Sequence, residues 1–216
     1  MQEAKTRVTK QRKLKYQDKA RSAMPSAGAT SYQSGLRAAV YGLWSGAYSI
    51  YDFIGDMNTV IRRGFTQAWY FGAYQCGVLP EDLTEEEKQR LEDEIVLEQG
   101  YVFGIATDIQ NGQKGEALLR THTVRIPMWV NRHANVTNIA RSYACGDEKL
   151  KWVMNPIKEH CGDCLMLSGR VYRASIWRTT GWEPKSRDLA CGGYKCGCDF
   201  EITSEPVTRG RPPRRI

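Results

Sequence analysis

The chain has 216 residues, a formal net charge of +7 at pH 7 and 41% hydrophobic residues. This length and composition allow one buried core and argue against wholesale disorder. No apolar run reaches the roughly 18 to 20 residues that span a bilayer, and the basic N-terminus lacks the apolar segment of a secretory signal. We therefore expect an intracellular, reducing compartment, in which the seven cysteines are thiols or metal ligands.

The excess positive charge lies at the two ends of the chain. Residues 1–30 hold eight Lys/Arg and two acidic residues, residues 209–216 hold four Arg and no acidic residue, and the body between them is slightly acidic. Basic arms gain affinity for phosphates by releasing counterions, so these tails are candidates for contact with DNA or an acidic partner surface, unless they only aid solubility. The candidate nucleic-acid-binding residues are Arg7, Lys10, Arg12, Lys13, Lys15, Arg209, Arg211, Arg214 and Arg215.

A small-residue linker over 24–35 is expected to precede a long helix over about 34–76. The helix prediction rests on apolar side chains spaced alternately three and four residues apart. These are Leu36, Val40, Leu43, Ala47, Ile50, Ile54, Met57 and Ile61. Glycines within this segment, such as Gly64 and Gly72, weaken a helix unless neighbouring elements pack closely against the bare backbone. Gly77 and Pro80 then end the helix.

Two further helical regions follow. Thr84 and Glu87 form a capping box, and the apolar stripe of this second helix continues to the loop at 111–115. Its acidic run over 85–94 is interpreted as a solvated face. The third region covers about 116–145, with Pro127 breaking or kinking it, and its two histidines are interpreted as ordinary surface or core side chains. The stripe consists of Leu91, Ile95, Val102, Ile105 and Ile109, and the histidines are His122 and His133.

The character of the chain changes at residue 146. Segments 149–155 and 169–177 are predicted as strands, and a short strand follows the last cysteines. This unit has too few apolar residues to be stable unaided. The predicted fold is mainly α (α+β), with a long helical hairpin or bundle followed by a small zinc-stapled β subdomain. The predicted segments are a basic arm and linker (1–33), a helical domain (34–145), a Cys-rich subdomain (146–204) and an Arg-rich tail (205–216).

Five cysteines supply the staple. Cys161 and Cys164 form a Cys-x2-Cys knuckle, and Cys191, Cys196 and Cys198 follow after a 26-residue excursion. Four thiolates in a tetrahedron are the preferred ligands of structural zinc. A four-coordinate ion needs one ligand fewer than the five cysteines present, and His160 is a further candidate. The spacing therefore does not determine which four residues bind the ion. Disulfides, a redox pair and an iron–sulfur cluster are weaker alternatives. The remaining two, Cys76 and Cys145, are predicted to be core thiols.

A Trp, a Cys-x2-Cys, a Leu-x-Gly-Arg-Val-Tyr segment, a Pro and a Cys-x-Cys follow one another in the second half of the chain. The residues of this pattern are Trp152, Cys161, Cys164, Leu167, Gly169, Tyr172, Pro184, Cys196 and Cys198. Through them, the region from roughly 85 to 200 resembles the C-terminal module of the phage head morphogenesis or minor head proteins, the phage Mu F-like family. The resemblance is strongest over 150–200, where zinc-like cysteine spacing coincides with a Gly-Arg-Val-Tyr segment. Family members commonly place a His after the proline, and Cys191 would take its place here.

The resemblance implies a minor structural protein of a tailed phage or prophage, made in the host cytoplasm and packaged in the virion head near the portal. Portal or capsid proteins would be its partners, DNA a further one, and neither a membrane nor a small-molecule substrate would be involved. A zinc-ribbon-type DNA-binding regulatory protein is the alternative, disfavoured because the body of the chain is net acidic. We expect no enzyme activity, since three scattered histidines do not supply the additional metal ligands of a nuclease.

Overall fold

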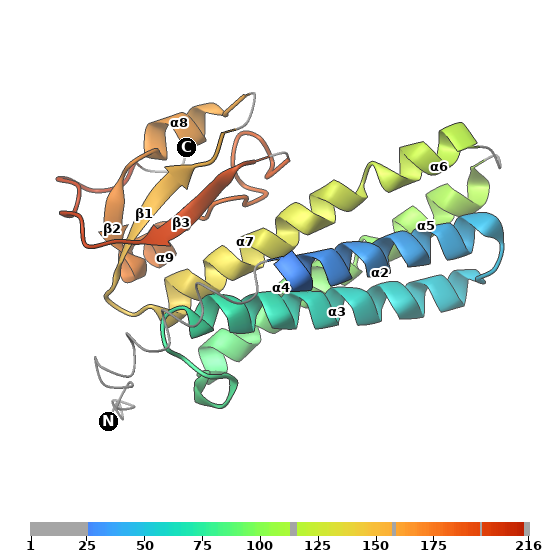
Figure 1. Ribbon diagram of the computed structural model, residues 1–216, viewed down its shortest axis with the longest axis horizontal. Coiled ribbons are helices and arrows are strands. Elements are labelled where there is room, and N and C mark those ends of the chain that lie inside the picture. Colours follow the sequence, from blue (N-terminus) through green and yellow to red (C-terminus); the bar gives the residue numbers. More distant parts are fainter. Residues whose placement is uncertain (1–25, 113–115, 157–158, 195, 214–216) are drawn as a thin grey trace.

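A computed structural model describes residues 26–112, 116–156, 159–194 and 196–213. Within these ranges the chain forms a long helical bundle with a small three-stranded sheet near its C-terminus, which confirms the predicted fold class. Figure 1 shows the sheet unit lying over one end of the bundle. The predicted DNA contacts that lie outside the described residues are Arg7, Lys10, Arg12, Lys13, Lys15, Arg214 and Arg215.

The first two helices form a hairpin. Helix α2 (Ser26–Ser45) covers most of the segment predicted as a linker, so that prediction was wrong from Ser26 onward. The single helix predicted over 34–76 is also wrong, because α2 ends before Gly46 and α3 (Ile50–Tyr74) begins at a new cap. Ser49 and Asp52 form a capping box, with each side chain bonded to the other's backbone N–H. Both halves of the apolar repeat thus enter one core.

The second helical region contains two helices. The Thr84 capping box is present and α4 (Glu85–Gln99) follows it, after a 3-10 turn, η1 (Pro80–Asp82). The chain then bends at residues 100–101 before α5 (Val102–Asn111), and all five residues of the predicted apolar stripe are buried. The acidic run is only partly a solvated face. Glu87 and Glu94 within it are buried, because the first caps α4 and the second bonds arginines.

Helix α7 (Ile126–Ala144) packs against α3 in the bundle and also contacts α9 and β3 of the sheet unit. It follows α6 (Glu116–Thr123), and Pro127 stands in its first turn as predicted. A Cβ added at Gly72 of α3 would lie 2.4 Å from the carbonyl oxygen of Thr137, so the bare backbone there is needed for α3 and α7 to pack together. In Figure 1, α7 extends from the bundle toward the sheet unit.

The sheet unit contains three antiparallel strands in the order β2-β1-β3. Central β1 (Lys149–Met154) pairs with β2 (Val171–Arg173) and with β3 (Cys198–Ile202), and α8 (Gly162–Leu167) lies between β1 and β2 in sequence. The strand predicted over 169–177 ends at Arg173, because the chain continues as α9 (Ala174–Thr180). Trp177 of α9 is fully buried against Trp152 and donates its indole N–H to the Leu150 carbonyl.

One face of α7 docks the sheet unit through polar side chains, which we name the α7 polar stripe. Their bonds reach the carbonyls of Gly193, Lys185, Pro184 and Phe200 and the backbone N–H of Phe200, at 2.8–3.3 Å. Buried backbone groups of the sheet unit are thereby paired by side chains from the bundle. The stripe consists of Asn131, Arg132, Asn135, Asn138 and Arg141.

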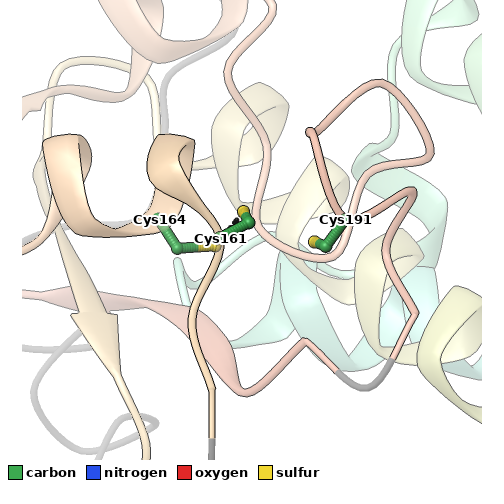
Figure 2. Close-up of side chains that lie close together, drawn as sticks. All are labelled: Cys161, Cys164 and Cys191. Carbon is green, nitrogen blue, oxygen red and sulfur yellow. Dashed lines mark hydrogen bonds between the residues drawn. The ribbon is translucent and has the colours of Figure 1, made fainter.

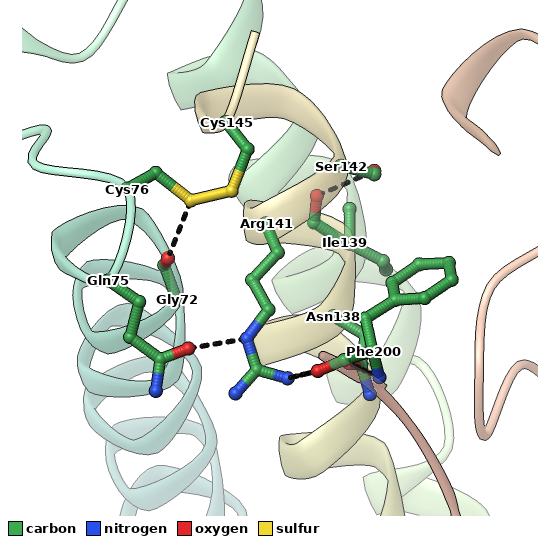
Figure 3. Close-up of a disulfide and its surroundings, with 9 residues drawn as sticks. All are labelled: Gly72, Gln75, Cys76, Asn138, Ile139, Arg141, Ser142, Cys145 and Phe200. Atoms are coloured by element: carbon green, nitrogen blue, oxygen red, sulfur yellow. Dashed lines mark hydrogen bonds between the residues drawn. A yellow bond between two sulfur atoms is a disulfide. The ribbon is translucent and has the colours of Figure 1, made fainter. Parts of the chain in front are cut away.

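The ends of α3 and α7 are joined covalently. Cys76 and Cys145 form a disulfide, which Figure 3 shows beside Arg141, and their Cα atoms lie 4.9 Å apart. The prediction that both are free core thiols was therefore wrong. Both cysteines are buried as predicted, but the last turns of the two helices lie side by side and bring the sulfur atoms together.

Candidate metal centre

Five cysteine side chains gather where α8 faces the loop that leads into β3. Cys161 is the N-cap residue of α8 and Cys164 lies in its first turn, whereas Cys198 begins β3. Figure 2 shows Cys191 on the loop opposite the start of α8. The sulfur atoms of Cys161, Cys164 and Cys191 all lie within 4.8 Å of one another, and so do those of Cys164, Cys196 and Cys198. Cys164 is common to both groups.

The sulfur separations suit a tetrahedral ion. The Cys164 sulfur lies 3.4 Å from that of Cys161 and 3.7 Å from that of Cys196. Thiolates about 2.3 Å from a tetrahedral ion stand about 3.8 Å apart. The donor set is therefore all-sulfur, largely buried and correctly spaced, and it could hold a metal ion.

Backbone N–H groups point at two of these sulfurs. The N–H of Gly193 bonds to Cys191, and those of Lys185 and Cys198 bond to Cys196. Such bonds stabilise a thiolate and orient it as a ligand. The turn that supplies the Gly193 N–H needs a glycine, since Gly193 has a φ of 73° and a Cβ there would lie 2.4 Å from the Lys185 carbonyl oxygen.

The thiols influence one another's ionisation strongly. Contacts from Cys164 and Cys198 lower the pKa of Cys196 to about 2, and the same contact with Cys196 raises the pKa of Cys164. Burial raises the pKa of Cys191 to about 12. The pKa of Cys198 is raised to about 11, because the contact with Cys164, which lowers it, is outweighed by the contact with Cys196 and by burial. Several thiolates can coexist here only if a cation balances their charge.

The other predicted site residues that the structure describes belong to neither sulfur group. His160 precedes Cys161 but belongs to neither group of possible ligands, and its buried Nδ1 has no hydrogen-bond partner among the described residues. Arg209 and Arg211 are exposed on the C-terminal segment. Backbone and side-chain bonds between Thr208 and Val171 tie that segment to β2.

The sequence did not lead us to expect a largely buried ion network near the cysteine cluster. Arg132 contacts Glu98 at 3.0 Å and Glu94 at 3.3 Å, and Arg187, near Cys191 in sequence, contacts the same two carboxylates at 3.2–3.4 Å. Arg90 contacts Glu94 at 2.8 Å. The spacing of Arg90, Glu94 and Glu98 by four residues places them on one helical face, which is the signal that could have indicated the network.

Comparison of the chain with family models, with curated proteins and with solved structures finds no match. Among the helices that the structure describes, none is both long and apolar enough to cross a membrane.

Proposed function

We propose that the cysteine cluster holds one structural Zn²⁺ ion. An all-thiolate tetrahedral site closed by protein ligands is the arrangement that zinc favours in small β units. Cys161, Cys164, Cys191, Cys196 and Cys198 are the residues that would hold it, with Cys164 required in either group. The bound ion would supply folding free energy to the sheet unit, because the ligands come from segments far apart in sequence.

We propose further that the protein is a minor structural protein of a tailed phage or prophage, which acts in head assembly near the portal and is packaged in the virion. Supporting this proposal, the residues that carry the family resemblance form the core around the cysteine cluster. Trp152, Leu167 and Tyr172 are at most 2% exposed, and Gly169 has a φ of 72° in the turn before β2. The residues of the resemblance are therefore core positions, a turn glycine and candidate metal ligands of one unit.

The proposal assigns the chain a structural role without enzyme activity. Portal or capsid proteins would be its partners, and the basic tails would contact DNA or an acidic protein surface. The polar contacts between α7 and the sheet unit suit this role, because they join the bundle and the cysteine cluster into one body.

Analysis of virions tests this function. Particles from the phage or induced prophage that encodes the chain should contain it inside nuclease-treated, DNA-filled heads, and chemical cross-linking should join it to the portal or shell. Deleting its gene should reduce the yield of complete heads. A zinc-ribbon regulator would instead be absent from particles and would protect a specific duplex sequence from nuclease, and that result would replace the proposal.

A further inference from the structure

A pocket of about 660 Å³ opens between α5, the first half of α7 and the loop that carries Cys191. Its lining is separate from the sulfur atoms of the metal centre, although Gly192 and Gly193 form part of its wall. The apolar side chains of Ile105 and Trp129 also line the pocket. It is large enough to accept one or two large side chains of a partner.

Exposed aromatic side chains line this pocket. Tyr101 and Tyr194 are 52% and 55% exposed, and Met128 is 36% exposed. Phe103, next in sequence to the lining residue Gly104, is 65% exposed. Exposed aromatic groups around a concave site are typical of protein-binding surfaces, where one buried aromatic or aliphatic anchor supplies much of the affinity.

The charged groups of the pocket favour an acidic partner. Arg125, Arg132 and Arg187 line it, against the carboxylates of Glu98 and Asp108. Arg187 contacts both of its buried carboxylates through a single nitrogen, Nη2. Its other guanidinium nitrogens have no hydrogen-bond partner in the described part of the chain, and the side chain is 28% exposed. A guanidinium with free donors binds a carboxylate strongly at a partly desolvated site.

We propose that this pocket is a docking site for a protein segment that carries a large apolar or aromatic side chain beside an Asp or Glu. The apolar side chain enters between Tyr101, Trp129 and Tyr194, and the carboxylate accepts hydrogen bonds from Arg187. The proposal rests on this geometry and charge alone, and it holds whether or not the chain is a virion protein.

Gly104 provides the test. It lines the pocket, and a Cβ at this position meets no atom within 4 Å, so Gly104→Leu fills the pocket without disturbing the packing of α5. Gly55 of α3 is the matched control, because it is also exposed, helical and open around its Cβ position. Each substitution replaces a helical glycine by a better helix former, and circular dichroism should show both variants folded.

A displayed library of random short peptides should be selected against the full chain and its two variants. We expect enriched peptides to carry Phe, Tyr, Trp or Leu close to Asp or Glu. The best peptide should bind Gly104→Leu about thirtyfold or more weakly than the original chain, and it should bind Gly55→Leu as tightly as the original chain. Changing its acidic residues to amides should cost about tenfold, as loss of a charge-assisted hydrogen bond does.

Three results would overturn the proposal. One is that no peptide distinguishes the full chain from Gly104→Leu. Another is that the enriched peptides are basic, which would contradict the role of Arg187. The third is that oligothymidine binds the full chain and is lost specifically in Gly104→Leu, since the pocket would then be a nucleic-acid site that stacks bases on its aromatic walls.

Discussion

At the scale of single residues, one histidine is buried inside the bundle. His133 of α7 stacks on the ring of Tyr32 of α2, with ring centroids 5.1 Å apart. Its Nε2 is buried and has no hydrogen-bond partner among the described residues. Burial lowers the pKa of His133 to about 4, because the charged imidazolium would lose its hydration. His133 therefore belongs to the core in its neutral form.

This lowered pKa predicts a pH dependence of stability. As the pH falls from about 6.5 toward about 4, the unfolded chain takes up a proton that the folded chain resists, so stability is lost in that window and no further below it. The total loss is about 3 kcal/mol. His133→Phe keeps the ring stack and removes the titrating group. Urea unfolding across this pH range should show the stability of the original chain falling relative to the variant, whereas parallel curves would contradict the assignment.

At the scale of elements, α7 connects the bundle to the sheet unit. Figure 3 shows Arg141 reaching Gln75 on one side and Phe200 on the other. The side chain is largely buried, and its guanidinium contacts the Phe200 carbonyl at 2.8 Å and Asp199 at 3.1 Å. The α7 polar stripe thus bonds to the end of α3 on one side and to the sheet unit on the other. Hydrogen-bond geometry therefore specifies how the sheet unit docks, in addition to apolar burial.

Replacing Arg141 tests this docking. Arg141→Met keeps the apolar stem but leaves the Phe200 carbonyl without this donor, and we expect a loss of about 2–4 kcal/mol in the free energy of unfolding. Arg63→Met on the exposed face of α3 is the control and should change stability by less than about 0.5 kcal/mol. Urea denaturation of both variants, compared with the original chain, measures the difference. Equal effects of the two substitutions would show that the stripe does not hold the units together.

The proposed zinc site gives a second prediction at this scale. Freshly purified, reduced protein should contain about one zinc per chain, and Cys164→Ser should lose it, because Cys164 belongs to both sulfur groups. Removal of the ion should abolish the near-ultraviolet circular dichroism of Trp152 and Trp177 in the sheet unit, while most of the helical signal of the bundle remains. Elemental analysis without zinc, or full retention of zinc by the variant, would be the contrary result.

Local signals predicted much of this architecture. The Thr84 capping box, Pro127 and the change of character at 146 are all properties of neighbouring residues, and the structure has them as expected. The turn between α2 and α3 was missed because the apolar spacing continues in phase across it. Its signals were Gly46 and the Ser49 cap. The disulfide could not be predicted, since its partners are 69 residues apart and meet only when α3 and α7 align.

At the scale of the whole molecule, the excess positive charge lies at the two ends of the chain. The described bundle and sheet unit contain most of the acidic residues, whereas residues 1–30 and 209–216 carry twelve of the 31 basic ones. The basic tails therefore attract a polyanion, whereas the body between them has a slight excess of negative charge. A polyanion would meet the tails first, because attraction to phosphates acts over about a Debye length, roughly 10 Å at moderate salt.

If the tails contact duplex DNA, binding should be independent of sequence and steeply salt-dependent. We expect a slope of log affinity against log salt between about −4 and −8, as not all twelve basic side chains engage at once. Deleting residues 1–21 and changing the four arginines of 209–216 to Gln should flatten it. The C-terminal segment is kept because the Pro213 carbonyl accepts a bond from Trp182. If this variant binds DNA at low salt as tightly as the original chain does, the tails serve a protein partner instead.

The disulfide between Cys76 and Cys145 makes part of the chain a closed covalent ring. It closes a ring that contains α4, α5, α6 and α7, so every helix between the two cysteines is held in a single macrocycle. In the chain-entropy model, closing a ring of this size stabilises the fold by about 4 kcal/mol. A specific protease site inserted between α5 and α6 should therefore yield, after cleavage, one species at full mass on a non-reducing gel and two fragments after reduction. Two fragments without reductant would show that the ring is open. After a single backbone cut inside this ring, the two pieces of the chain are still joined covalently through the disulfide.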